Sequence, residues 1–190
     1  MKIIFATSNE NKVKEVKEIL PKHIAIVSLK EMGYTEDIEE TGSTLEENSL
    51  LKAQTIFDKY KLPVLAEDTG LEVDALQGAP GVYSARYAGE HGNSEANMQL
   101  LLKNLEKEDN RKAQFRTVAT FIAENSSSIY TGVVRGEIIK EKTGEKGFGY
   151  DPIFIPAGFD KTFAEMSSQE KSIVSHRAIA MQKFAQHFEN

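Results

Sequence analysis

Residues 63–71 read Pro-Val-Leu-Ala-Glu-Asp-Thr-Gly-Leu, and this stretch decides the fold expected for the chain. The apolar run 63–66 predicts the end of a buried strand, which carries two adjacent carboxylates, Glu67 and Asp68, into a turn. At the carboxyl ends of strands in an open α/β sheet, paired acids hold Mg²⁺ or activate a water molecule. The alternative is an ordinary turn, in which Asp68 hydrogen-bonds to local backbone and Glu67 points to solvent.

Length and composition predict one soluble domain over residues 1–190, with room for two lobes. The chain is 40% hydrophobic and 27% charged, and it is long enough to bury a substantial core. Its net charge of -6 argues against nucleic acid and membrane surfaces as partners, because both are recognised through basic surfaces. The chain has no cysteine, and no run approaches ~18 apolar residues. We therefore expect a cytoplasmic protein without disulfides, thiolate metal sites or membrane spans.

A strand and then a helix are predicted near the start of the chain, from residues 2–6 and from the apolar residues of 13–20. Between them lies a small polar loop whose members are Thr7, Ser8, Asn9, Glu10, Asn11 and Lys12. In one interpretation, free backbone N–H groups at the helix start and the Lys12 ammonium hold a phosphate. In the other, Ser8 or Asn9 only caps the helix and Lys12 is solvated. The loop is not a Walker A motif, because the glycines and the Gly-Lys-Ser/Thr ending are absent.

Further helices are expected where small polar residues precede an apolar pattern. Ser43-Thr44-Leu45-Glu46 has the form of a capping box, and Ser94 is a plausible cap for a helix through Leu105. On the first of these helices Glu47, Asn48 and Lys52 are close enough to share a patch, unless Glu47 and Lys52 are simply surface charges. Residues 115–123 and 129–139 are predicted to form a hairpin.

The stretch Gly147-Phe148-Gly149-Tyr150-Asp151 has glycine on either side of an aromatic residue. Glycine lets the backbone approach a ligand closely, while the ring offers a face on which a purine can stack. A tight turn packed by aromatic residues is the alternative.

Seven short motifs follow one another along the chain and together resemble the Ham1 family. Each is weak alone, but their order and spacing cover essentially the whole chain. They are Thr7-Ser8-Asn9-x-x-Lys12, Glu39-Glu40-Thr41-Gly42, Glu47-Asn48-x-x-x-Lys52-Ala53, Glu67-Asp68-Thr69-Gly70-Leu71, Gly81-Val82-Tyr83-Ser84-Ala85-Arg86, Gly147-Phe148-Gly149-Tyr150-Asp151-Pro152 and Ser175-His176-Arg177.

The members of this family are inosine triphosphate pyrophosphatases, also called XTP/dITP diphosphatases. The resemblance implies a Mg²⁺-dependent enzyme that cleaves ITP, dITP and XTP between the α- and β-phosphorus, giving the monophosphate and pyrophosphate. It also implies an elongated mixed sheet flanked by helices, two lobes with an active-site groove between them, and a homodimer. Glu145-Lys146 departs from the small residues that are typical of the family at this point of the chain.

The resemblance further assigns site residues. Asp68 corresponds to the catalytic acid, which orients or deprotonates the attacking water, and it binds the metal together with Glu40. Glu67 is either another metal ligand or a support. Substrate contacts fall to Thr69, to Lys52 and to the triphosphate-facing loop Thr7, Ser8, Asn9, Glu10, Asn11 and Lys12. The purine-binding set comprises Phe148, Gly149, Tyr150, Asp151, Lys171, His176 and Arg177.

At the base, Phe148 or Tyr150 is expected to stack while Lys171, His176 and Arg177 donate to the 6-keto oxygen. Adenine carries an amino group there, so ATP should be rejected, whereas guanine shares the keto group and its exclusion is not explained. A Mg²⁺-dependent phosphatase, a pyrophosphatase for other nucleotides, a nucleotide-binding module and an α/β scaffold are the alternatives.

Overall fold

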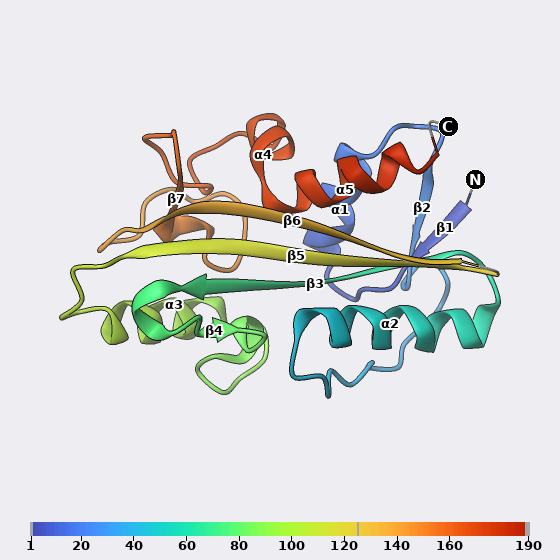
Figure 1. Ribbon diagram of the computed structural model, residues 1–190, viewed down its shortest axis with the longest axis horizontal. Helices are drawn as coiled ribbons and strands as arrows, with labels where there is room; N and C mark the ends of the chain where they lie inside the picture. The colour runs from blue at the N-terminus through green and yellow to red at the C-terminus, as the bar shows by residue number, and fades with distance from the viewer. Residues whose placement is uncertain (1, 125, 189–190) are drawn as a thin grey trace. The chain divides into compact units, whose positions relative to one another are not determined.

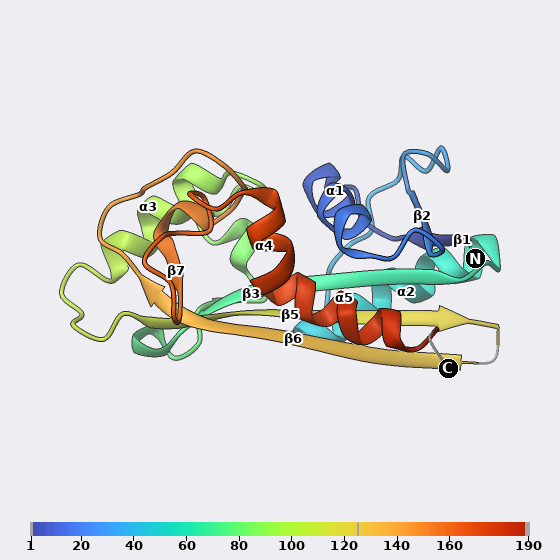
Figure 2. The same cartoon turned by 90° about the horizontal axis from the view of Figure 1, so that it is seen from above.

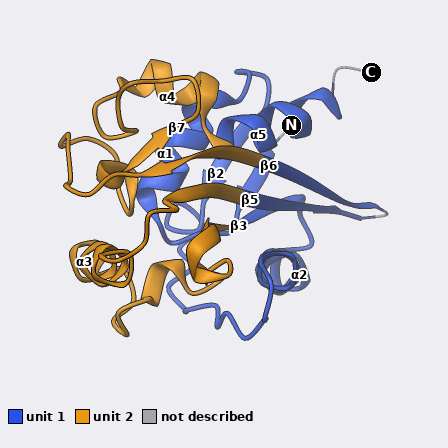
Figure 3. Cartoon of the chain, turned by 60° about the vertical axis from the view of Figure 1, so that its left-hand side comes forward, with its two compact units in different colours: residues 1–68, 117–132, 177–190 blue, residues 69–116, 133–176 orange. Residues whose placement is uncertain are grey.

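The computed structural model describes residues 2–124 and 126–188, and the chain divides into two compact units (Figure 3). Unit 1 comprises residues 1–68, 117–132 and 177–190, and unit 2 comprises residues 69–116 and 133–176. The expectation of a single domain with two lobes stays a prediction.

The strands form one mixed sheet, which confirms the predicted α/β class. They are β1 (Lys2–Phe5), β2 (Ala25–Ser28), β3 (Val64–Val73), β4 (Pro80–Gly81), β5 (Lys112–Ala123), β6 (Ser126–Ile138) and β7 (Phe154–Pro156). Their order is β2-β1-β3-β5-β6-β7, and β4 pairs with β3. β1 is parallel to β2 and β3, whereas β4 and β7 are antiparallel to β3 and β6 respectively.

Helices accompany both units. The α-helices are α1 (Glu10–Ile19), α2 (Leu45–Tyr60), α3 (Ser94–Asn104), α4 (Ser168–Val174) and α5 (His176–Gln186), and the 3₁₀ turns are η1 (Asp74–Leu76), η2 (Ser84–Arg86) and η3 (Asp151–Ile153). The predicted hairpin corresponds to β5 and β6, which are neighbours in the sheet (Figure 2). Both strands are longer than expected, and Asn125 of the expected connection lies outside the described residues.

In unit 1 the strands are covered on both faces, because successive side chains of a strand point in opposite directions. Ile4, Ala6, Val64 and Ala66 form one core with Ala53 and Ile56 of α2. Ile3, Phe5 and Leu65 form the other core with residues of α1 and α5. Figure 1 shows α2 on one side of these strands and α1 and α5 on the other.

Unit 2 has its own core, in which α3 packs on the sheet through Met98, Leu101 and Leu105. Phe115, Phe154 and Phe163 fill its centre, with the Phe115 and Phe154 rings arranged edge to face at 4.8 Å between centroids. α4, which the sequence did not predict, begins with a capping box formed by Ser167 and Glu170. It spans only seven residues, too few to display a helical period.

The expected turn after Ala66 is wrong. β3 continues through Glu67, Asp68 and Thr69 to Val73, and the side chains of both acids are buried. Gly70 lies within the strand, and glycine is required there because β4 approaches closely. An added Cβ atom would lie 2.6 Å from the Gly81 carbonyl oxygen. The alternative in which Glu67 points to solvent is therefore also wrong.

Two helix caps lie one residue away from their predicted positions. Thr44, not Ser43, caps α2, and Glu47 completes the capping box. The Ser43 hydroxyl instead donates to the Glu47 carboxylate at 2.8 Å. Asn93, not Ser94, caps α3 through the Ala96 backbone N–H. In both cases two adjacent polar residues were able to cap, and the register of the apolar face selected between them.

Candidate functional site

The two adjacent acids of β3 serve different faces of the sheet. Because side chains alternate along a strand, Asp68 lies on the α2 face with Val64 and Ala66, and Glu67 lies on the opposite face with Leu65. Asp68 meets side chains of α2, and Glu67 meets side chains of α1 and α5. The sequence had suggested that the two carboxylates act together in a turn, but the strand geometry separates them.

Asp68 belongs to a compact polar cluster with Glu40, Asn48 and Lys52. The Lys52 ammonium lies 3.1 Å from Asp68 Oδ1 and 2.6 Å from Glu40 Oε1. Asn48 donates from Nδ2 to Asp68 Oδ2 at 3.3 Å and accepts from the Gly42 backbone N–H at 2.8 Å. One lysine and one asparagine on the same face of α2 thus tie the Glu40 segment to the acid of β3.

Burial and charge set the protonation behaviour of this cluster. Burial raises the pKa of the Asp68 carboxyl, and the nearby ammonium groups of Lys52 and Lys12 oppose that shift without cancelling it. Burial disfavours the charged form of Lys52, but the carboxylates of Asp68 and Glu40 outweigh it and raise the pKa of Lys52. Asp68 therefore has a higher proton affinity than an exposed aspartate, as suits a group that takes up a proton during a reaction.

The donor set at Asp68 suits a hard divalent cation. Two carboxylates, from Glu40 and Asp68, already converge on one positive charge, the Lys52 ammonium. Among residues 2–124 and 126–188, no group of three or more His, Asp or Glu side chains is arranged to hold a metal ion. Mg²⁺ is commonly held by only one or two carboxylates together with substrate phosphates, so Glu40 and Asp68 fit it.

Glu67 is the centre of a second cluster, on the other face of β3. Arg177 of α5 donates to it twice, from Nη2 to Oε1 at 2.7 Å and from Nε to Oε2 at 2.8 Å. The Lys12 ammonium of α1 lies 3.1 Å from Oε1. Arg177 also forms an ion pair with Glu15.

Glu67 stays ionised within this cluster. Burial by itself favours the neutral acid, but the charges of Arg177 and Lys12 prevail and lower the pKa of the Glu67 carboxyl. The pKa of Arg177 is raised, because its two carboxylate partners outweigh the cost of burying its charge. The four side chains of Lys12, Glu15, Glu67 and Arg177 together carry no net charge, which makes their burial tolerable.

The predicted triphosphate-facing loop leads into α1 and is ordered by its own side chains. Asn9 Oδ1 accepts from the backbone N–H groups of Asn11 at 3.0 Å and Lys12 at 3.3 Å. Asn9 is therefore the cap, as one of the two predicted candidates, and it uses the N–H groups of Asn11 and Lys12. The role of the loop toward phosphate stays a prediction. Thr7 Oγ1 accepts from the Asn9 N–H at 3.2 Å. Ser8, Glu10 and Asn11 are exposed.

In unit 2 the predicted purine-binding residues Phe148, Asp151 and Lys171 lie together. The Lys171 ammonium donates to Asp151 Oδ2 at 2.6 Å and lies 5.0 Å from the centre of the Phe148 ring. Asp151 Oδ2 also accepts from the Phe148 backbone N–H at 2.9 Å. Gly147 is required here, because it has a φ of +75° and an added Cβ atom would lie 2.0 Å from Asp151 Oδ2.

Tyr150 and His176 are held inside unit 2. Tyr150 is buried and donates its hydroxyl hydrogen to the Ser84 carbonyl at 2.9 Å, so it cannot stack on a ligand and Phe148 remains the available ring. The His176 ring stacks on Phe115 at 4.6 Å between centroids, and it lies beside Phe163, as the Lys171 ammonium also does.

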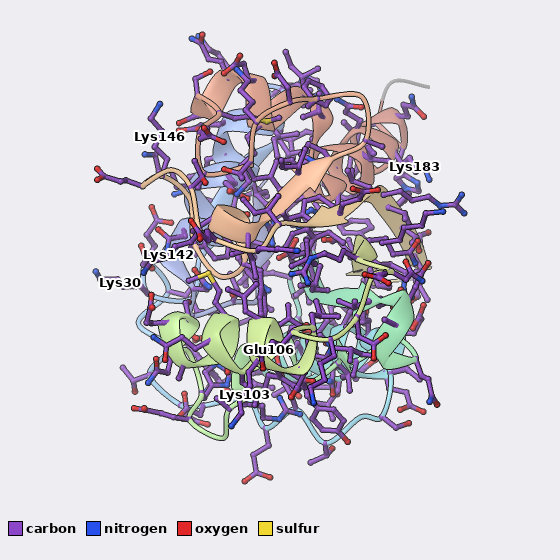
Figure 4. The ribbon with its side chains drawn as sticks, turned by 90° about the vertical axis from the view of Figure 1, so that its left-hand side faces the viewer. Lys30, Lys103, Glu106, Lys142, Lys146 and Lys183 are labelled. Carbon is purple, nitrogen blue, oxygen red and sulfur yellow. The ribbon has the colours of Figure 1, made fainter. Side chains whose placement is uncertain are left out.

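Gly149 and Thr69 have more accessible positions. Both are half-buried, Gly149 in the loop after Phe148 and Thr69 on β3 directly after Asp68. Glu145 and Lys146, the residues that depart from the family pattern, are exposed, and Figure 4 shows Lys146 extending outward. Their larger side chains thus need no space inside unit 2.

The Arg177 guanidinium is fully buried, and it pairs with Glu67 and Glu15. Its expected role as a donor to the purine stays a prediction. Asn48 and Lys52, which are predicted to share a patch of one helix, both contact Asp68. No role was predicted for Glu15, whose partner Arg177 stands 162 positions away in the sequence.

Comparisons with known proteins identify the family of this chain. The model of the Ham1 family matches residues 3–187. A protein of Christiangramia forsetii named dITP/XTP pyrophosphatase is 51% identical over 187 residues, 98% of each chain. The Bacillus subtilis protein of the same name is 49% identical over 96% of this chain and 94% of its own. The solved structure of the Staphylococcus aureus Ham1 protein covers 100% of this chain and 98% of its own, with 41% identity and a TM-score of 0.89.

The helices formed by residues 2–124 and 126–188 include none that is long and apolar enough to cross a membrane.

Proposed function

Because this chain belongs to the Ham1 family, we propose that it hydrolyses the non-canonical purine nucleoside triphosphates ITP, dITP and XTP to the monophosphate and pyrophosphate. The observation that carries the proposal is the similarity, over 98% of the chain, to a protein named dITP/XTP pyrophosphatase. Such an activity removes deaminated purines from the nucleotide pool.

Asp68 is the proposed catalytic residue. Its buried carboxyl accepts a proton from the attacking water or orients that water toward the phosphorus. The Lys52 ammonium and the Asn48 amide hold both carboxylate oxygens, which fixes the direction of the base. Catalysis of phosphoryl transfer rests mainly on such positioning and on charge stabilisation, because little covalent chemistry falls to the protein.

The triphosphate requires positive charge within an acidic protein whose net charge is -6. Lys12 and Lys52 supply it, because the charges of both ammonium groups act on the Asp68 carboxyl although Lys12 pairs with Glu67 on the other face of β3. The loop from Thr7 to Asn11 and Thr69 are proposed as further substrate contacts. Glu40 and Asp68 would hold Mg²⁺, which when bound would supply further positive charge for the phosphates and make water more acidic.

Purine recognition is assigned to unit 2. Phe148 stacks on the base, and Lys171 and His176 supply donors for its 6-keto oxygen. Asp151 fixes the Lys171 ammonium, since the two groups lie 2.6 Å apart in a buried ion pair. Gly149 lets the backbone approach the base. ATP is rejected because its 6-amino group would leave buried donors unsatisfied.

We extend the proposal to the setting of the enzyme. It includes a homodimer located in the cytoplasm, with a purine nucleoside triphosphate as substrate and with neither nucleic acid nor membrane as partner. The charge of -6 supports the last two points, since nucleic acid and anionic membrane surfaces attract basic proteins.

The test is a panel of canonical and deaminated nucleoside triphosphates with Mg²⁺, in which pyrophosphate and orthophosphate are measured separately. We expect ITP, dITP and XTP to be cleaved with much higher kcat/KM than ATP and GTP, with pyrophosphate as the product. Equal rates for ITP and ATP would refute the proposed selectivity. Release of orthophosphate would identify a phosphatase instead.

A further inference from the structure

We propose that Glu67 is a positioning residue, which holds the Lys12 ammonium in place for the polyphosphate and does not bind the metal. This inference rests on the proposed function, because it concerns the proposed triphosphate site. It assigns a separate task to each of the two neighbouring acids of β3.

The direction of the side chains is the first argument. Glu67 and Asp68 are consecutive residues of a regular strand, so their carboxylates point to opposite faces of the sheet. Glu40, the other carboxylate that fits a metal, shares Lys52 with Asp68 on the α2 face. A cation held by Glu40 and Asp68 is therefore on the wrong side of β3 for Glu67.

The use of the Glu67 oxygens is the second argument. Oε1 receives the Arg177 Nη2 at 2.7 Å and the Lys12 Nζ at 3.1 Å, and Oε2 receives the Arg177 Nε at 2.8 Å. The paired contacts of a guanidinium fix both the position and the plane of a carboxylate. Arg177 thus orients Glu67, and Glu67 in turn presents Oε1 to Lys12.

The side chains of Lys12 and Glu67 also differ in their exposure to solvent. The Lys12 side chain is 16% exposed, whereas that of Glu67 is completely buried. Lysine has a flexible four-carbon stem, so an ammonium without an anchor samples many positions. The buried Glu67 carboxylate restricts the Lys12 ammonium before the substrate binds, which lowers the entropic cost of binding.

The competing effect is electrostatic. The negative charge of Glu67 weakens the attraction of Lys12 for phosphate. If charge alone mattered, removal of the Glu67 charge would therefore lower the Kd for a phosphate ligand, whereas loss of positioning raises it. Arg177 and Glu15 lie in the same cluster, however, and Arg177 neutralises Glu67 at shorter range than Lys12 does. Removal of the Glu67 charge leaves the two cations Lys12 and Arg177 with one carboxylate, Glu15, which pairs with Arg177, so Lys12 loses the carboxylate that holds it in position.

The experiment measures binding of pyrophosphate by calorimetry in EDTA, so that no metal takes part. We expect Glu67→Gln and Lys12→Ala each to raise the Kd by roughly tenfold, the effect of losing one charge-assisted contact. In the double variant the Kd should be no higher than in Lys12→Ala alone, because Glu67 acts through Lys12. Glu72→Gln is the matched control, since Glu72 stands on the same strand and pairs with Arg116.

A second measurement addresses the metal. The Mg²⁺ concentration for half-maximal ITP hydrolysis should rise in Glu40→Gln and remain unchanged in Glu67→Gln, while KM for ITP rises in the latter. Should Glu67→Gln not fold, Glu67→Asp replaces it, because it keeps the charge but withdraws the carboxylate from Lys12 by one methylene.

The outcomes separate this inference from the proposed function. An unchanged or lower Kd in the Glu67 variant, additive effects in the double variant, a raised Mg²⁺ requirement, or no metal-free binding by the unmodified protein overturns the inference. If the unmodified protein does not hydrolyse ITP but the expected Kd pattern holds, the proposed function fails and the role of Glu67 stands.

Discussion

At the scale of single residues, Asp68 combines two properties that a buried acid rarely has together. Its carboxylate is held by Lys52 and Asn48, and yet burial keeps its pKa above the ordinary value of 3.8. Removal of its charge should therefore affect chemistry more than structure, because an asparagine retains the size of the side chain and an oxygen for Lys52.

We expect Asp68→Asn to lower kcat for ITP at least 100-fold, which is about the least that a general base contributes. The unfolding free energy should change little by comparison, and denaturant unfolding checks this in parallel. Asp58→Asn, an exposed acid of α2 that pairs with Lys61, is the control and should retain full turnover. Near-normal turnover in the Asp68 variant would remove Asp68 from the proposed mechanism.

The separation of the partners along the sequence explains why only one of the two clusters was predictable. Asp68, Glu40 and Lys52 are close in sequence, and their association follows from one motif order and one helix face. Glu67 is different, since its main partner Arg177 stands 110 residues away. Nothing near Glu67 in the sequence indicates a counter-charge, and two acids beside a glycine resemble a turn. The long-range ion pairs keep the strand buried.

At the scale of secondary-structure elements, α2 supplies Asn48 and Lys52 from its first two turns, close to its capped end. The Thr44 hydroxyl accepts from the Glu47 backbone N–H at 3.1 Å, and Glu47 in return accepts from the Thr44 N–H. The start of the helix, and with it the position of both side chains, depends on this reciprocal pair.

Thr44→Ala should reduce the unfolding free energy by about 1 kcal/mol, the usual cost of losing a cap. Urea denaturation measures it. Thr55→Ala, at an exposed interior position of the same helix, serves as control and should be neutral or slightly stabilising, since alanine favours helices. Equal effects of the two substitutions would show that the cap does not contribute.

The turn after β2 depends on a charged group that titrates. The Ser28 backbone N–H donates to Glu31 at 2.7 Å, and Lys17 lies 3.0 Å from the same carboxylate. These contacts, the backbone bond first, lower the pKa of Glu31 from 4.5 to about 2. Since the folded state holds this proton more weakly than the unfolded state does, the stabilisation is complete above the ordinary pKa and disappears below the lowered one.

Glu31→Gln should therefore be less stable than the unmodified protein at neutral pH, and the difference should shrink as the pH falls from 4.5 to about 2. The size of the effect is small, because both side chains of the ion pair are largely exposed. Denaturation curves of both proteins across this range measure the difference. A difference that is independent of pH would mean that the carboxylate charge has no part in the turn.

Element boundaries were predicted where local sequence decides them. The first strand, the apolar faces of the helices and the hairpin of β5 and β6 follow from periodicity. α4 was missed because it is short, and the end of β3 was placed at Ala66, where the apolar run stops. In that case pairing with β4 and ion pairs from α1, α2 and α5 decide the boundary, and these belong to tertiary structure.

At the scale of the whole molecule, the chain is acidic, whereas Lys12 is half-buried and Lys52 is buried beside carboxylates. In the proposed site a polyphosphate ligand would contact Lys12 and Lys52 directly, whereas a long polyanion would be repelled by the net charge of -6. We therefore expect the protein to bind a nucleoside triphosphate but not a nucleic acid.

We expect no binding to a short labelled DNA duplex at low salt with a Kd tighter than about 10⁻⁴ M, the weak end of ordinary non-specific binding. Fluorescence anisotropy measures it, and a basic protein of similar size provides the positive control. Binding that weakens steeply with added salt would contradict the expectation and reveal a basic surface that the net charge conceals.

The distance along the chain between Glu67 and its partners also has a consequence for the order of folding. The ion pairs of Lys52 with Glu40 and Asp68 join residues only 12 and 16 positions apart, so they close short loops. Arg177 pairs with Glu67 and Glu15 across 110 and 162 positions. Closing these longer loops costs more conformational entropy, so these contacts are expected to form more slowly. We therefore expect the ion pairs of Asp68 and Glu40 with Lys52 to form before those of Glu67 and Glu15 with Arg177. In a chain whose α5 has not yet packed, Lys12 would then pair with a Glu67 carboxylate that lacks its guanidinium partner.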